Sequence, residues 1–384
     1  MQYIPYGRQD ISEADVEAVV RVLRGEYLTQ GPAVPAFEEA IQRFCAVKHA
    51  VAANSGTSAL HLACLALGVG PGDVVWTSPI TFVASANCAR YCGADVDFVD
   101  IDPVSCNLDV AALEAKLEHV ARMPKAVIPV HLGGLPCDMT EIGRLAQRYG
   151  FKVIEDASHA LGSTYRGERV GSCRYSDITV LSFHPVKLIT SAEGGMATTN
   201  DAALARRMAL LRTHGITREP AEMTHEPDGA WYYQQTELGL NYRMTDVHAA
   251  LGRSQLERLE AFLKRREELA SRYDRLLADT GLRLPARDAH STSAWHLYIV
   301  GWNSKRSGLT RAQAFKRLRD AGIGVNVHYI PVHLQPYYRS LGFRAGQFPN
   351  AEAYYADAIT LPLYASMSDA QQDRVVDTLR GMLK

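Results

Sequence analysis

Short apolar runs that alternate with helix-like segments are the feature that most constrains the fold of this chain. Apolar runs typical of strands lie at residues 49–54, 73–78, 96–100, 125–131, 152–156, 177–183 and 195–199. Helical patterns separate them, near residues 57–67, 81–91, 109–121, 138–149 and 200–213. The runs are continuous rather than alternating, which is typical of strands buried on both faces. We therefore expect an α/β fold with a mostly parallel, seven-stranded sheet between helices.

The pattern changes after residue 213. Residues 215–235 are rich in Glu, Pro and aromatics and predict an irregular excursion, and a long amphipathic helix is expected at 245–279. A smaller α+β unit follows, with an apolar run at 295–300, a helix near 310–321, a strand-like segment at 325–329 and a closing helix near 368–382. The length of 384 residues suits two domains. We place a large domain at 1–255 and a small C-terminal domain at 256–384.

Charge and cysteine content narrow the classes of partner. The 41 Lys and Arg residues nearly balance 42 Asp and Glu, so the net charge of −1 gives no support for a nucleic-acid or membrane partner. The seven cysteines are odd in number and include no CxxC pair, which predicts reduced thiols and no metal site. Neither a signal-peptide pattern nor a run of 18 apolar residues occurs, so we expect a cytoplasmic protein.

The first candidate binding motif is Asn54-Ser55-Gly56-Thr57-Ser58, which follows a predicted strand and opens an apolar helix. Gly56 permits close backbone approach, and the free amides of a helix N-terminus bind phosphate. An ordinary Ser or Thr N-cap would have the same residues. The motif by itself leaves both interpretations open.

A second motif ends the predicted strand 152–156 with Glu155 and Asp156, and His159 follows. Ligands of α/β sheets bind beyond the carboxyl ends of the strands. Asp156 could therefore pair with a cationic ring nitrogen, although Asp156 or Glu155 could equally cap the next turn. His159 could lie beside a ligand or pack as a structural histidine.

The third motif places Lys187 after the apolar strand 177–183 and before the Gly-rich segment 193–195. A lysine among apolar neighbours at a sheet edge can have a lowered pKa and attack an aldehyde, whereas most loop lysines are simply solvated. Together the three motifs offer an anion site, a carboxylate and an amine. Pyridoxal 5'-phosphate (PLP) presents the matching groups, which are a phosphate, a pyridine nitrogen and an aldehyde.

These residues belong to a longer set of markers by which the whole chain resembles the DegT/DnrJ/EryC1/StrS family of PLP-dependent sugar aminotransferases, which have fold type I. The markers are YLTQGP (27–32), NSGTSALHLA (54–63), SPITFVASAN (78–87), EDASHALGS (155–163), SFHPVKLITSAEGG (182–195), GLNYRM (239–244) and VHYIP (327–331). Within the family, SHALGS, the lysine segment and VHYIP are most similar to the branch that acts in pseudaminic acid biosynthesis. That branch aminates C4 of a UDP-linked 4-keto-6-deoxy N-acetyl sugar and usually takes the amine from glutamate.

The resemblance implies roles for the cofactor-binding residues. Lys187 would hold PLP as a Schiff base and move the proton during transfer, with pyridoxamine 5'-phosphate as the intermediate form of the cofactor. Asp156 would pair with the pyridine nitrogen, Phe82 would stack on the ring, and His159 would lie near the phenolic oxygen, where many relatives have glutamine. The phosphate would be held by Gly56, Thr57 and Ser182, and by Asn241 from the partner subunit of a homodimer with a shared active site.

Five further positions match family residues near the nucleotide sugar, although each could also be a packing or surface residue. They are Tyr6, Tyr27, Thr29, His328 and Tyr329.

Other functions are compatible with parts of this pattern. A sugar 3-aminotransferase, or one that uses another nucleotide sugar, would share the motifs. A nucleotide-sugar oxidoreductase would need G-x-G-x-x-G in the first strand–helix turn, which this sequence lacks. A PLP-binding regulator would need a basic helix-turn-helix extension, and none is recognisable. The dehydrating branch of the family replaces the lysine with histidine, whereas Lys187 is present.

Overall fold

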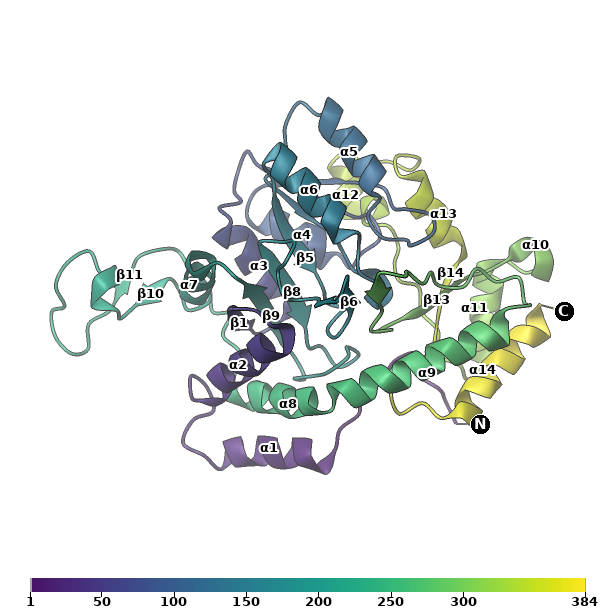
Figure 1. Ribbon diagram of the computed structural model, residues 1–384, viewed down its shortest axis with the longest axis horizontal. Helices are drawn as coiled ribbons and strands as arrows, with labels where there is room; N and C mark the ends of the chain where they lie inside the picture. Colours follow the sequence, from purple (N-terminus) through teal and green to yellow (C-terminus); the bar gives the residue numbers. More distant parts are fainter. Residues whose placement is uncertain (1, 384) are drawn as a thin grey trace.

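A computed structural model describes residues 2–383 of the chain, and its centre is a seven-stranded sheet with the order β1-β9-β8-β5-β4-β2-β3 (Figure 1). Strand β9 is antiparallel to both of its neighbours, and the remaining pairs are parallel. The predicted α/β class with a mostly parallel sheet is therefore confirmed. The strands are β1 (His49–Ala53), β2 (Val74–Thr77), β3 (Asp95–Phe98), β4 (Ala126–Ile128), β5 (Lys152–Asp156), β8 (Ile178–Ser182) and β9 (Gly195–Thr199).

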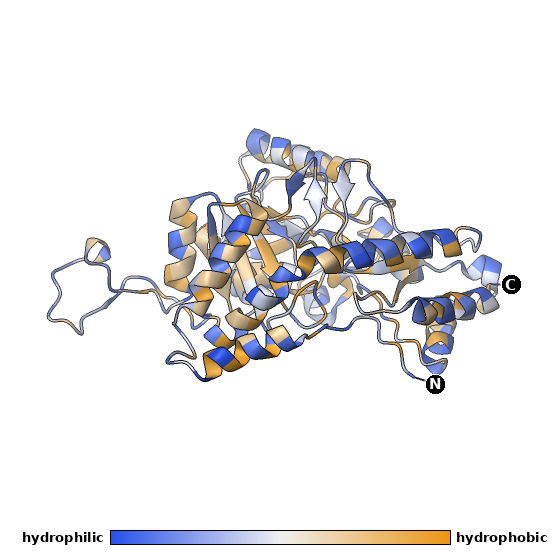
Figure 2. Cartoon of the chain, turned by 60° about the horizontal axis from the view of Figure 1, so that its bottom comes forward, coloured by the Kyte–Doolittle hydropathy of each residue, from blue (hydrophilic) through white to orange (hydrophobic). Residues whose placement is uncertain are grey.

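Helices cover both faces of this sheet because successive side chains of a strand point to opposite sides. Val75 packs with one set of helices, whereas its neighbours Val74 and Trp76 pack with another. The first set is α3 (Gly56–Ala66), α4 (Ala84–Tyr91) and α7 (Ala202–Leu211), and the second is α5 (Val110–His119) and α6 (Met139–Tyr149). In Figure 2 many helices carry apolar residues on one side and polar residues on the other, as expected of helices with one buried face.

The second part of the chain builds a smaller layer around α9 (Leu259–Leu277) and α14 (Asp369–Met382), which pack together. Strands β13 (Tyr298–Gly301) and β14 (Ala358–Leu361) pair antiparallel beside α11 (Arg311–Asp320). The N-terminal segment joins this layer through Ile4, which bridges to Ile323. The division into residues 1–255 and 256–384 stays a prediction, because one apolar cluster contains residues from both parts, such as Ile80 and Leu297.

The prediction of one continuous helix at 245–279 is wrong. This segment is divided at Arg258 into α8 (Asp246–Glu257) and α9. The guanidinium of Arg258 binds Asp10 at 2.7 Å and Asp15 at 2.6 Å. Helix α8 packs on α1 (Glu13–Leu23) and α2 (Ala33–Cys45), whereas α9 packs on α14, so each half follows a different neighbour.

The strand-like segment 325–329 is also not a strand. Only Asn326 forms a bridge, to Thr360, because the residues that follow turn toward a cavity. The excursion after residue 213 projects from the body of the molecule and holds the short pair β10 (Ile216–Thr217) and β11 (Gln234–Gln235), with the 3-10 turn η2 (Pro220–Glu222) between them (Figure 1). Among the described residues, no helix has both the length and the apolar character that crossing a bilayer requires.

Candidate active site

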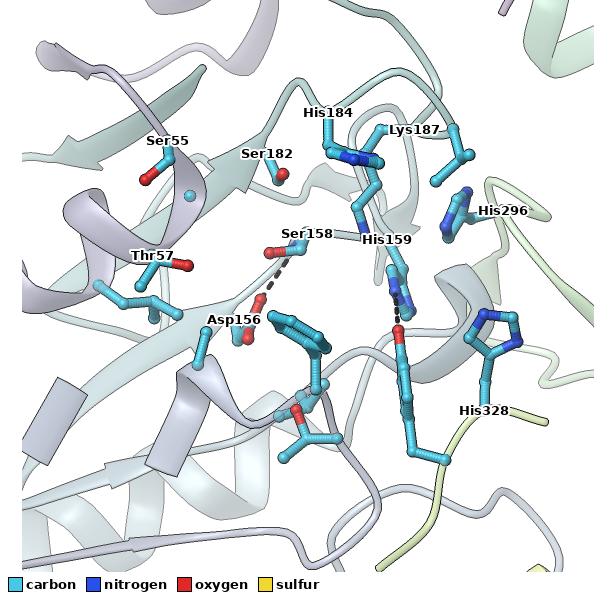
Figure 3. A pocket seen from close by; sticks show the side chains of 18 of the residues that line it. Ser55, Thr57, Asp156, Ser158, His159, Ser182, His184, Lys187, His296 and His328 are labelled. Atoms are coloured by element: carbon cyan, nitrogen blue, oxygen red, sulfur yellow. Dashed lines mark hydrogen bonds between the residues drawn. The ribbon is translucent and has the colours of Figure 1, made fainter. Parts of the chain in front are cut away.

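A cavity of about 520 Å³ lies where the carboxyl ends of β1, β5 and β8 meet at one edge of the sheet. Ligand sites of open α/β sheets are found at such edges, and the volume suits a small molecule. Most of the predicted site residues line this cavity, although they come from distant parts of the sequence (Figure 3). They are Tyr6, Gly56, Thr57, Phe82, Asp156, His159, Ser182, Lys187, His328 and Tyr329.

The carboxylate of Asp156 is buried and held by hydrogen bonds at the end of β5. Ser85 Oγ donates to Asp156 Oδ2 at 2.6 Å, and the backbone amide of Ser158 donates to Oδ1 at 3.1 Å. Thr81 Oγ1 lies 2.7 Å from Ser85 Oγ. Because Ser85 donates its proton to the carboxylate, Thr81 is the donor in the hydrogen bond between the two hydroxyls. The carboxylate is thus fixed at the cavity wall, with lone pairs left for a cationic partner.

Strand alternation separates Asp156 from its neighbour Glu155. Glu155 points to the other face of the sheet, where it contacts His131 Nε2 at 2.8 Å and accepts a hydrogen bond from Thr179 Oγ1 at 3.0 Å. Of the two carboxylates that the sequence left open, Asp156 therefore lines the cavity and Glu155 serves the interior of the fold.

Lys187 reaches the same cavity from the turn after β8, which its amide closes by donating to the carbonyl of His184 at 2.8 Å. Burial lowers the pKa of the Lys187 amine from 10.5 to about 8, although the negative charge of Asp156 acts in the opposite direction. A substantial fraction of the amine is therefore neutral and nucleophilic near pH 8.

The first turn of α3 forms a third part of the cavity wall. Ser55 caps the helix by accepting the amide of Ser58, which leaves the first-turn amides of Gly56 and Thr57 without an intrahelical acceptor. A Cβ on Gly56 would lie 3.0 Å from the Cβ of Ser182, so glycine permits the close approach of these two segments. Gly195 is equally constrained, since a Cβ there would lie 2.4 Å from the Ser55 carbonyl oxygen. The N-cap interpretation of this motif is confirmed for Ser55, and anion binding by the free amides of the turn stays a prediction.

The opposite side of the cavity is formed by aromatic residues and histidines. His159 Nε2 lies 3.1 Å from Tyr329 Oη, and His328 Nδ1 lies 2.8 Å from Thr360 Oγ1. The rings of Tyr6 and His328 have centroids 5.5 Å apart, and those of Phe82 and Tyr329 are 6.3 Å apart. Phe82 is 57% exposed, so its ring is free to cover a ligand.

Three of the residues predicted from the resemblance do not line this cavity. Tyr27 is 54% exposed near the surface, and Thr29 bridges to Thr245 before α8. Asn241 is exposed at a bridge to Thr213, and its carbonyl accepts a hydrogen bond from Asn54 Nδ2 at 3.4 Å. Contributions of these residues to a site within one chain are therefore not supported, and the expected contribution of Asn241 to a partner subunit stays a prediction.

The structure adds residues that the sequence analysis did not single out. Ser85 and Thr81 hold Asp156, and His296 and Asn326 also line the cavity. Ser85 stood in the motif SPITFVASAN, where a buried helical serine was the available signal. His296 precedes β13 in an apolar run, and no local pattern distinguishes it from a core histidine.

Comparison with known proteins gives consistent matches over the whole chain. A model of the DegT/DnrJ/EryC1/StrS aminotransferase family matches residues 9–380. The spore coat polysaccharide biosynthesis protein SpsC of Bacillus subtilis is 42% identical over 100% of this chain and 97% of that protein. The UDP-4-amino-4,6-dideoxy-N-acetyl-beta-L-altrosamine transaminase of Campylobacter jejuni is 38% identical over 99% and 98%. The GDP-perosamine synthase of Caulobacter vibrioides is 41% identical over 90% and 89%.

Solved structures share the fold. Helicobacter pylori PseC, an aminotransferase of pseudoaminic acid biosynthesis, superposes with a TM-score of 0.91 at 30% identity, over 100% of this chain and 99% of PseC. The PLP-form of Spr1654 from Streptococcus pneumoniae gives 0.89 at 31% identity, over 99% and 98%, and its PMP-form gives the same values.

Proposed function

This chain belongs to the DegT/DnrJ/EryC1/StrS aminotransferase family, and from that premise we propose that it aminates C4 of a UDP-linked 4-keto-6-deoxy N-acetyl hexose in pseudaminic (nonulosonic) acid biosynthesis, with L-glutamate as the donor. The general activity, that of a sugar aminotransferase, follows from the family. The named activities of the Campylobacter transaminase and of PseC support the narrower substrate. The observation that carries the chemistry is that Lys187, Asp156 and the first turn of α3 line one cavity.

The cavity fits PLP, which is consistent with the PLP-form and PMP-form of Spr1654. The free amides of Gly56 and Thr57, with Ser182, would hold the phosphate, and the buried carboxylate of Asp156 would hold the pyridine nitrogen in its protonated state. Lys187 would supply the amine for the covalent bond. When bound, PLP supplies an aldehyde and an electron-accepting ring.

Residues of the chain account for the proton transfer. With its amine free, Nζ of Lys187 would accept the proton from Cα of the amino acid in the first half of the reaction and would deliver one to C4 of the sugar in the second half. Its lowered pKa suits both directions near neutral pH. Asp156 does not move a proton in this scheme; hydrogen bonds from Ser85 and from the Ser158 amide hold its side chain at the cavity wall.

An absorbance spectrum of the purified protein tests the cofactor assignment. We expect a band in the range of a lysine-linked PLP that disappears on borohydride reduction, after which peptide mapping finds the label on Lys187. A protein that binds no PLP, or a label on another lysine, would contradict the assignment.

The substrate is tested separately by incubation with candidate keto sugars. We expect nuclear magnetic resonance of the product to show nitrogen at C4 of the UDP-linked N-acetyl sugar. The runner-up is a 3- or 4-aminotransferase for another nucleotide keto sugar, which is favoured by the 41% identity to GDP-perosamine synthase. Amination of a GDP-linked sugar, or at C3, would establish that runner-up.

We also propose that the active site is shared within a homodimer, with Asn241 of one subunit near the cofactor phosphate of the other. Asn241 is exposed and lies outside the cavity of its own chain, as this arrangement requires. The test mixes two inactive variants, Lys187→Ala and Asn241→Asp, and re-forms dimers. Mixed dimers regain one intact site if the site is shared, whereas activity that stays absent would contradict it.

A further inference from the structure

A chain of three groups on one side of the cavity fixes the direction of hydrogen bonds there. The backbone amide of Gly133 donates to His159 Nδ1 at 3.3 Å, and His159 Nε2 lies 3.1 Å from Tyr329 Oη. Because a backbone amide can only donate, Nδ1 of His159 is an acceptor and carries no proton. The proton of the neutral ring therefore lies on Nε2, which donates to Tyr329.

The surroundings of His159 keep its ring in this single form. The ring is 4% exposed, and burial lowers its pKa well below the ordinary value, with the nearby amine of Lys187 acting in the same direction. The backbone of Gly133 is also held in place, since its carbonyl accepts a hydrogen bond from the amide of Leu297 at 3.1 Å. His159 is thus held neutral, with one acceptor and one donor nitrogen.

Tyr329 then has its own proton available for a ligand. Its oxygen accepts from His159, and no acceptor for its O–H lies among residues 2–383. Burial and the nearby charge of Asp156 raise its pKa, so Tyr329 donates a hydrogen bond without giving up the proton. Tyr329 belongs to the cavity lining, and the centroid of its ring is 6.3 Å from that of Phe82.

His296 braces this arrangement from behind. Its ring centroid is 4.4 Å from that of His159, it is 4% exposed, and its buried Nδ1 has no hydrogen-bond partner within residues 2–383. Its carbonyl accepts from the buried guanidinium of Arg266 at 3.4 Å, which fixes the backbone. A ring without hydrogen bonds of its own limits rotation of His159 by packing alone.

The charge of the side chains on this side of the cavity indicates which kind of ligand group binds there. Among the described residues that line the cavity, Lys187 is the only lysine or arginine. Neutral imidazoles and hydroxyls suit a ketone oxygen or a sugar hydroxyl as ligand. A carboxylate ligand instead favours a positively charged and often bidentate partner. The keto oxygen of the sugar must also lie close to Lys187, because the carbonyl carbon that carries it reacts beside that residue.

We propose that Tyr329 donates a hydrogen bond to the oxygen on the reacting carbon of the keto sugar, and that His159 and His296 are positioning residues that aim this hydroxyl. The inference rests on the proposed sugar aminotransferase function and deepens it. No bond to Tyr329 forms or breaks. Its hydrogen bond polarises the C=O group for attack by the amine and is absent from the half of the reaction that consumes the amino acid donor.

The activity test separates the two half-reactions in single-turnover measurements. For Tyr329→Phe we expect the ratio of the sugar half-reaction rate to the donor half-reaction rate to fall about 30-fold, which corresponds to about 2 kcal/mol and is typical of a buried polar group that loses its hydrogen-bond partner. Tyr355→Phe removes a hydroxyl outside the cavity lining and should leave the ratio unchanged. Equal losses in both half-reactions would show a structural role and overturn the proposal.

His159 variants test whether the two residues act in series. His159→Leu should lower the same ratio about as much as Tyr329→Phe does. In the double variant the ratio should fall by at most about a further threefold compared with either single variant. His159→Gln should recover most of the rate, because an amide can also accept from Gly133 and donate to Tyr329. His296→Phe should keep the packing against His159 and leave the ratio unchanged, whereas His296→Ala should lower the ratio. Additive losses at His159 and Tyr329 would contradict the series arrangement.

A measurement without cofactor or substrate completes the test. In the apo-protein labelled with 15N-histidine, we expect the His159 signal, assigned with His159→Gln, to report a proton on Nε2. A proton on Nδ1 would overturn the proposal whichever sugar is the substrate. If the protein instead aminates a different keto sugar, the half-reaction test is run on that sugar, so failure of the proposed substrate and failure of this inference are distinguishable.

Discussion

The two walls of the cavity differ in which parts of the sequence supply their residues and in the charge that those residues carry. The sheet wall comes from the carboxyl ends of parallel strands and from the segments that follow them, and it is formed by Gly56, Thr57, Asp156, Ser182 and Lys187. The histidine wall is formed by Tyr6, His159, His296, His328 and Tyr329, which come from both ends of the chain as well as from the sheet. The sheet wall holds a carboxylate and an amine, whereas burial keeps the histidine wall neutral. The charged wall thus suits the cofactor, and the neutral wall suits the sugar.

The largest effect should come from removing the amine of the sheet wall. Lys187→Ala should lower turnover by about 10⁴-fold or more, because it removes both the nucleophile and the proton carrier. The protein should still bind PLP noncovalently, but borohydride should no longer fix the label, as mass spectrometry would show. Lys305→Ala, at an exposed lysine, is the control. Near-normal transamination by Lys187→Ala would refute the role of the sheet wall.

Removing the charge of Asp156 should have the next largest effect. Asp156→Asn keeps the shape and an acceptor for Ser85 but loses the negative charge that would stabilise a protonated ring nitrogen. We expect kcat to fall about 100-fold with both substrates, measured in the two half-reactions. Asp177→Asn, which alters an ion pair with Lys152 outside the cavity lining, is the matched control. A loss of less than threefold would count against the proposed contact.

The pH dependence of cofactor attachment should reveal the environment of Lys187. The neutral amine is the reactive form, and a pKa of about 8 means that its fraction rises from roughly one tenth at pH 7 to roughly nine tenths at pH 9. The rate of borohydride-fixable attachment to apo-protein should rise about tenfold over this range and then level off. A rise that continues past pH 9 would indicate an ordinary lysine. In Asp156→Asn the plateau should begin at lower pH, because the charge that raises the pKa is gone.

The smallest effects should come from two matched substitutions, each of which removes a hydroxyl that contacts a residue of one wall. Ser85→Ala removes the donor to Asp156, and Thr360→Val removes the partner of His328 Nδ1. We expect losses of about 3- to 10-fold for each, in line with single neutral hydrogen bonds. Ser85→Ala should slow both half-reactions, whereas Thr360→Val should mainly raise KM for the sugar. Identical profiles for the two variants would remove the distinction between the walls.

The sequence predicted the sheet wall well because each of its residues is tied to a strand that a local pattern reveals. The seven predicted strands all occur, and Asp156, Ser182 and Lys187 stand at or just beyond their ends. Once parallel strands are placed in one sheet, their carboxyl ends meet at one edge. The histidine wall had no comparable rule. His296 follows no motif, and the position of Tyr329 depends on a segment that was wrongly expected to be a strand.

What the sequence determined by itself was therefore the sheet, the residues at its carboxyl edge and the resemblance that links them to aminotransfer. The tertiary structure alone decided that the helix expected at 245–279 is divided at Arg258, that Glu155 and Asp156 serve opposite faces, and that His296 packs against His159. Periodicity along a chain reports which side of an element is apolar. It does not report which distant segment covers that side, because this depends on the packing of elements that are far apart in sequence.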